Sequence, residues 1–207
     1  MFIISNDCTG GHLYKQLNIK HNHPFFWCVI EPKDMLFLCT HFNEINFNNI
    51  DVDKSSKTKE WSTAKNTFDI IIESKLRIHY IHNKLSMTDN IVRKVGGDLY
   101  YRYAYKLTYD NYIKRLKRMQ QLNIPPKFLI TENLSFGYTK QWLEKICLET
   151  KNSVIALTNT ELKHNNLAKI IKISDKNTLN YSNGRTLEIC NEVLNNNEFM
   201  TSIDYVV

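Results

Sequence analysis

Residues 2–17 read FIISNDCTGGHLYKQL and combine an apolar run, a polar turn with two glycines, and a helical repeat. The run from Phe2 to Ser5 is typical of a short buried β-strand, whereas Leu13 and Leu17 lie four residues apart, as on one face of a helix. Paired glycines between two such segments indicate a turn. This stretch therefore predicts a strand, a turn and a helix in succession.

The second half of the chain repeats this alternation after two consecutive prolines. The pattern predicts strands over 127–131, 153–157 and 168–173, and helices over 139–149 and 186–194. Strands that alternate with helices pair in parallel through right-handed crossovers. We therefore expect an α/β fold, a three-layer sandwich with a mostly parallel central sheet of the Rossmann-like or SGNH-hydrolase-like kind, with residues 1–207 forming a single domain.

The middle of the chain is more varied, and an X-Pro step at residues 31–32 is a typical helix start. The predicted elements are a strand over 25–30, a helix over 32–42, an exposed polar loop around 53–59, a hairpin of 68–73 and 76–82 across Ser74-Lys75, and a helix over 97–122.

Composition limits the classes of protein. The 207 residues are 43% hydrophobic, enough for one substantial core, and no apolar run approaches the roughly 18 residues that cross a bilayer. The first residues lack the features of a secretory signal, so we expect a cytoplasmic protein without a membrane span, compatible with peripheral association with a membrane assembly. Five scattered cysteines indicate neither a disulfide framework nor a zinc site, and no metal is expected.

The formal net charge of +6 fits a nucleic-acid partner, an anionic cofactor or a lysine-rich solvated surface. Because the lysines are spread over the whole chain, the solvated surface is the favoured interpretation, and no nucleic-acid partner is expected. The one dense basic stretch, residues 109–119, contains Lys114, Arg115, Lys117 and Arg118. Such a cluster either clamps phosphate, as in coenzyme A or a nucleotide sugar, or covers a solvated helix face.

The glycine turn is the candidate site, because ligands of open parallel sheets gather at the carboxyl ends of the strands. A thiol near a helix N-terminus has a lowered pKa, so Cys8 is the first candidate nucleophile, with Ser5 second. The alternative is a small buried cysteine in an ordinary turn. Glycines also let the backbone approach a ligand, so the predicted cofactor-binding residues are Asn6, Gly10, Gly11, His12, Arg115 and Arg118.

A catalytic cysteine needs a histidine, and His79 and His82 lie in one predicted strand. Their odd spacing places them on opposite faces, so only one of them meets the site easily. His82, nearer the strand end, is the preferred base, with His79 and His12 as alternatives. The opposing interpretation is that both are hydrogen-bonded strand histidines.

Five segments together resemble a known family. They are FIISNDCTGGHLY at 2–14, Pro24-Phe25, IHYIH at 78–82, YIKRLKR at 112–118 and FLITE at 128–132. In this order they are similar to a bacterial family of unknown function labelled exopolysaccharide or capsule biosynthesis protein, and more weakly to putative papain-like cysteine peptidases. The resemblance covers roughly residues 1–160, and against it residues 83–107 form an insertion that we expect to be helical.

The resemblance implies a role in surface polysaccharide assembly, with a saccharide or polysaccharide precursor as partner. The leading hypothesis is an acyltransferase or related ester hydrolase with Cys8 as nucleophile, His82 as base and acyl-coenzyme A as a candidate donor. One alternative is a glycosyl or phosphoglycosyl transferase in which Cys8 is incidental. Another is a non-catalytic carbohydrate-binding component.

Overall fold

A computed structural model describes residues 1–20, 23–54, 68–80, 97–174 and 185–203. One of its two sheets is parallel and has the order β1-β6-β7-β8. The strands are β1 (Ile3–Ser5), β6 (Lys127–Thr131), β7 (Ser153–Thr158) and β8 (Ala168–Lys172). Each lies where the sequence predicts a strand, and the parallel pairing confirms the α/β class.

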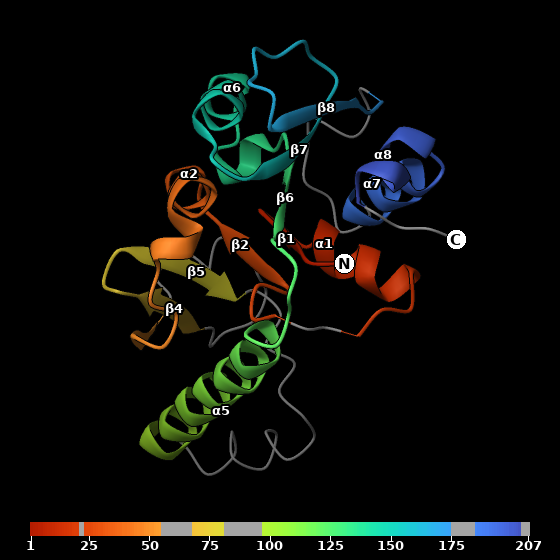
Figure 1. The fold of residues 1–207 in the computed structure, drawn as a ribbon. Helices are drawn as coiled ribbons and strands as arrows, with labels where there is room; N and C mark the ends of the chain where they lie inside the picture. The colour runs from red at the N-terminus through yellow and green to blue at the C-terminus, as the bar shows by residue number, and fades with distance from the viewer. Residues whose placement is uncertain (21–22, 55–67, 81–96, 175–184, 204–207) are drawn as a thin grey trace.

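Helices cover both faces of this sheet because its strands are apolar on both sides. Ile3 and Leu129 belong to one core cluster, whereas their neighbours Ile4 and Phe128 belong to the other. The layered arrangement predicted from the sequence is confirmed. Figure 1 shows α1 (Thr9–Gln16), α7 (Arg185–Leu194) and α8 (Asn197–Ser202) on one side of the parallel sheet, and α2 (Pro32–His41) and α6 (Lys140–Glu149) on the other.

A second sheet is antiparallel and has the order β2-β5-β4-β3. Its strands are β2 (Cys28–Ile30), β3 (Ile50–Lys54), β4 (Phe68–Ile72) and β5 (Leu76–Tyr80). The predicted hairpin is confirmed, and Lys75 N donates to Ile72 O at 3.0 Å across its turn. Glu73 and Ser74 have positive φ angles of 52° and 57°, a conformation uncommon outside glycine.

The sequence predicts an exposed polar loop around residues 53–59, but strand β3 extends to Lys54 and so includes the first two of these residues. Ile50 and Val52 alternate with Asp51 and Asp53, and this short pattern is half-apolar because only one face of the strand is buried. The remainder of the predicted loop, residues 55–59, lies outside the described residues.

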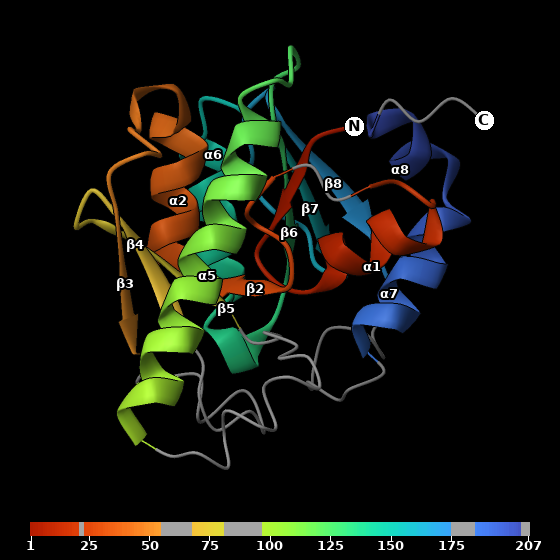
Figure 2. The ribbon, with the colours of Figure 1, turned by 90° about the horizontal axis from the view of Figure 1, so that it is seen from below.

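The long helix α5 (Gly97–Met119) packs against β3 and β4, as Figure 2 shows. Tyr112, Leu116 and Met119 form its buried stripe, and Tyr112 Oη donates to Phe47 O at 3.1 Å. Residues 97–107 of the predicted helical insertion belong to α5, while 83–96 lie outside the described residues. None of the described helices combines the length and the apolar character that a membrane span requires.

Short 3-10 helices at η1 (Phe42–Glu44) and η2 (Leu134–Phe136) complete the described elements.

Asn6 links the two sheets at the end of β1. Its side-chain Nδ2 donates to Thr131 O, and its Oδ1 accepts from Thr131 N, both at 2.9 Å. The Asn6 carbonyl also accepts from Ile30 N of β2 at 3.0 Å. The side chain therefore extends the β1–β6 ladder while the backbone connects the parallel sheet to the antiparallel one.

We predict that Asn6→Ala lowers the free energy of unfolding by about 2 to 4 kcal/mol, because it leaves the buried N–H and C=O of Thr131 without partners. Urea unfolding measures the change. The matched control is Asn123→Ala at an exposed position, where we expect a change within about 0.5 kcal/mol. Equal, small effects of both substitutions would contradict a linking role for Asn6.

Candidate functional site

The turn after β1 is organised around a carboxylate at the start of α1. Asp7 Oδ1 accepts from Thr9 N at 2.9 Å, and His12 N donates to Cys8 O at 3.0 Å. A negative charge is favourable at a helix N-terminus, where backbone N–H groups point outward. Asp7 thus already supplies the anion that a phosphate-bearing ligand would bring to this helix end.

Both glycines lie inside α1, which begins at Thr9, whereas the sequence pattern places them in a turn before the helix. A Cβ atom on Gly10 would lie 2.8 Å from Ser5 Cβ, and one on Gly11 would lie 3.0 Å from the indole of Trp27. The absence of side chains therefore lets α1 pack closely on β1 and on Trp27. Close packing within the protein accounts for these glycines.

Cys8 is 2% exposed and belongs to the apolar core. Burial raises the pKa of its thiol well above the usual value, and the negative charge of Asp7 raises this pKa further. Both effects outweigh the helix N-terminus, which favours the thiolate. In this conformation Cys8 is a buried neutral thiol.

Ser5 and His12, the other candidate catalytic and binding residues near this turn, also pack against neighbouring residues. Ser5 is 1% exposed, with its Oγ 3.5 Å from Asp7 Oδ1, and the His12 ring packs edge-on against Trp27 at 5.0 Å between centroids. His82 lies outside the described residues, so its distance from Cys8 is not defined.

The basic stretch on α5 divides into two faces. Arg115 and Arg118 are half-buried, whereas Lys114 and Lys117 are exposed. Burial raises the pKa of Cys28 to about 12, and the positive charge of Arg115 acts in the opposite direction. Cys28 belongs to the same core cluster as Cys8.

A different group of polar residues lies on one face of the antiparallel sheet. Asp69 of β4 pairs with both Asp53 of β3 and His79 of β5, so the three side chains share a face. The neighbouring residues Ile70 and Ile78 point to the opposite face, into the core. Period-two alternation in three strands thus produces one apolar and one polar face.

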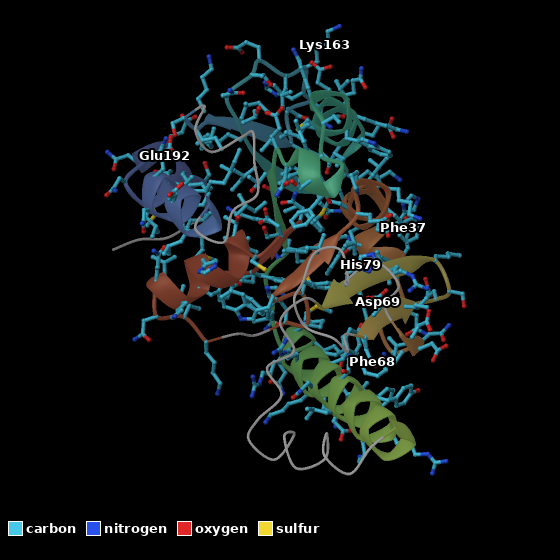
Figure 3. The ribbon with its side chains drawn as sticks, turned by 180° about the vertical axis from the view of Figure 1, so that it is seen from behind. Phe37, Phe68, Asp69, His79, Lys163 and Glu192 are labelled. Atoms are coloured by element: carbon cyan, nitrogen blue, oxygen red, sulfur yellow. The ribbon has the colours of Figure 1, made fainter. Side chains whose placement is uncertain are left out.

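His79 lies between two carboxylates on this polar face. Its Nδ1 is 3.0 Å from Asp69 Oδ2, and its Nε2 is 3.7 Å from Oε1 of Glu31, the residue at the start of α2. Arg77 Nη1 donates to the same Asp69 oxygen at 2.8 Å. Figure 3 shows Asp69 and His79 side by side on β4 and β5. These distances place the imidazole ring between the two carboxylates, with Nε2 on the side of Glu31.

A cavity of about 540 Å³ lies beside His79. Asp69 is 0% exposed and does not line the cavity, His79 lines it at 1% exposure, and Glu31, at 17% side-chain exposure, is the most accessible of the three residues. The cavity is lined by Glu31, Lys33, Asp34, Asp51, Ile71, Ser74, Lys75, Arg77 and His79.

Asp34 is a buried acid of the cavity wall, at 4% exposure. Burial raises the pKa of its carboxyl to about 6, while Lys33 acts to lower this pKa and Glu31 to raise it. Its carboxylate accepts a hydrogen bond from the backbone N–H of Arg77. This contact attaches the first turn of α2 to β5.

Sequence reasoning named His79 but missed Glu31, Asp34 and Asp69. The hairpin register contained a signal for Asp69, because a turn near Ser74 places it opposite His79. Glu31 and Asp34 come from a helix whose packing on β5 no local pattern indicates. Within the described ranges, no three His, Cys, Asp or Glu side chains are grouped so that they could hold a metal ion.

We predict that iodoacetamide modifies Cys8 in the folded protein more than about tenfold more slowly than in denaturant, because the thiol is buried and its pKa is raised. Site-resolved mass spectrometry over time measures the rate, with the four other buried cysteines as internal controls. Rapid modification confined to Cys8 would contradict this expectation.

We also predict that Asp34→Asn gains stability relative to the wild type as the pH rises from about 4 to about 7. The folded state binds the Asp34 proton more tightly than the unfolded state does, since the folded pKa is raised. Wild-type stability therefore loses this contribution through that window. Urea unfolding of both proteins at several pH values measures the difference, and a pH-independent difference would contradict the raised pKa.

Comparisons with known proteins add one finding about the first part of the chain. No curated protein matches the sequence. Residues 1–91 match a family described as a domain of unknown function (DUF1919), and this range contains both the Cys8 turn and every residue that lines the His79 cavity.

Proposed function

We propose that the protein is an acyltransferase or related ester hydrolase that acts at a hydroxyl group of a saccharide precursor, with Glu31 as the proton acceptor in the His79 cavity. The observation that carries the proposal is the line Asp69, His79, Glu31, which runs from a fully buried carboxylate to one accessible from a cavity. Saccharide as the substrate class rests on the family resemblance of the sequence.

Each member of this line has a physical role. Glu31 takes the proton from the attacking hydroxyl, and a general base in reach of that hydroxyl lowers the barrier. His79 lies between Glu31 and Asp69 and stabilises the change in charge on Glu31 when it accepts the proton. Asp69 orients the imidazole ring. Arg77 holds Asp69 in place. Asp69 does not line the cavity, and His79 lines it at only 1% exposure, so both are positioning residues for the more exposed Glu31.

The reaction balances without a protein nucleophile. The acceptor oxygen attacks the acyl carbonyl carbon and forms the new C–O bond as its proton passes to Glu31. The C–S bond of an acyl thioester then breaks, and the departing sulfur takes the proton from Glu31. In ester hydrolysis water attacks instead of the hydroxyl, the C–O bond of the ester breaks in place of the C–S bond, and the departing alcohol oxygen takes the proton from Glu31. The exposed Lys33 and Lys75 of the cavity suit a phosphate-bearing donor such as acyl-coenzyme A.

We expect Glu31→Gln to reduce the rate of acetyl transfer or ester hydrolysis about 100-fold or more, since it removes the proton acceptor. The assay supplies acetyl-coenzyme A with a panel of saccharide acceptors, and 4-nitrophenyl acetate as a simple ester. The matched control is Glu44→Gln, an exposed glutamate of η1, which we expect to leave the rate unchanged.

Two further variants complete the test. His79→Gln should lower the rate at least about tenfold and change the shape of the pH–rate profile, which a purely structural role would not do. Cys8→Ala should keep most of the activity, whereas loss of activity in Cys8→Ala with full activity in Glu31→Gln would favour the cysteine mechanism instead. Transfer from nucleotide sugars but not from acyl donors would overturn the acyl assignment.

A further inference from the structure

Asp34 lines the cavity but has no role in the proton transfer proposed for Asp69, His79 and Glu31. It comes from the first turn of α2, is 4% exposed and lies in the cavity wall with Glu31 and His79. The backbone N–H of Arg77 holds its carboxylate in place. A carboxylate so fixed presents a defined hydrogen-bonding direction.

One oxygen of this carboxylate has no protein partner among the described residues. Asp34 Oδ2 is buried, and no hydrogen bond to it is formed within those ranges. A buried acceptor without a partner carries a desolvation cost, which a ligand that donates a hydrogen bond to it recovers. The burial that creates this cost also raises the pKa of the group to about 6.

The charges around Asp34 favour an uncharged donor. Among the residues of the cavity wall, Glu31, Asp34 and Asp51 carry three formal negative charges, and Lys33, Lys75 and Arg77 carry three positive ones. The carboxylates of Glu31 and Asp34 are the less exposed groups, whereas both lysines are exposed. The inner part of the cavity therefore accepts hydrogen bonds and disfavours an anionic group.

We propose that Asp34 determines specificity at this site, by accepting a hydrogen bond from a second hydroxyl group of an uncharged, polyhydroxylated substrate whose reacting hydroxyl or ester faces Glu31. This inference rests on the proposed function for the role of Glu31. It adds the class of compound that the cavity selects and the residue that selects it.

The test compares two esters with Asp34→Asn, which keeps the size of the side chain. Methyl glucoside monoacetate retains free hydroxyl groups beside its ester, whereas 4-nitrophenyl acetate has none. We expect Asp34→Asn to raise KM for the sugar ester roughly ten- to hundredfold, because the amide presents a donor where the carboxylate accepts. KM for 4-nitrophenyl acetate should stay unchanged. The control Glu44→Gln alters an exposed acid outside the cavity and should leave both KM values unchanged.

Binding of methyl glucoside, followed by NMR line broadening, gives a readout that needs no turnover. Weaker binding to Asp34→Asn than to Glu44→Gln supports the inference. Equal binding to both, no binding to the wild type, or equal losses with the two esters would overturn it. If Glu31→Gln hydrolyses both esters as fast as the wild type, the proposed function fails, and the binding comparison still decides the role of Asp34.

Discussion

The fold depends on the hydrogen bonds of Asn6 at the end of β1. Strand β1 has only three residues, and its ladder with β6 would end at Ser5 without further support. The amide side chain reproduces the donor and acceptor of one more peptide unit toward Thr131. Since the Asn6 carbonyl also accepts from Ile30, the same residue fixes where the antiparallel sheet meets the parallel one. Buried polar groups satisfied in this way define one arrangement of the two sheets.

The position of β2 then determines the position of the cavity. β2 ends at Ile30, and α2 begins two residues later, so Glu31 and Asp34 are delivered to the polar face of β5. The Tyr138 hydroxyl donates to Ile30 O at 2.5 Å, so a second hydrogen bond holds the end of β2 in place. A short connection between a strand and a helix leaves little freedom, which is why a helix start forms one wall of the site.

Burial affects the residues around Cys8 and the residues around His79 differently. Around Cys8 it produces a neutral thiol, and the nearby Asp7 carboxylate is used for the helix N-terminus. Around His79 the buried groups have charged neighbours, since Asp69 Oδ2 lies 3.0 Å from His79 Nδ1 and accepts from Arg77 Nη1. A buried ionisable group with charged partners can retain acid–base chemistry, whereas an isolated one takes its neutral form.

The sequence by itself determined the parallel sheet, the hairpin and most helices, because each rests on periodicity within a few residues, as in Lys127–Thr131 or Leu76–Tyr80. It also identified His79 as a candidate. Only the tertiary structure decided that Cys8 is buried and that Glu31 stands beside His79, since both depend on which distant elements pack together. Local sequence patterns contain no record of such packing, because a turn with a thiol reads the same in a core and in an open cleft.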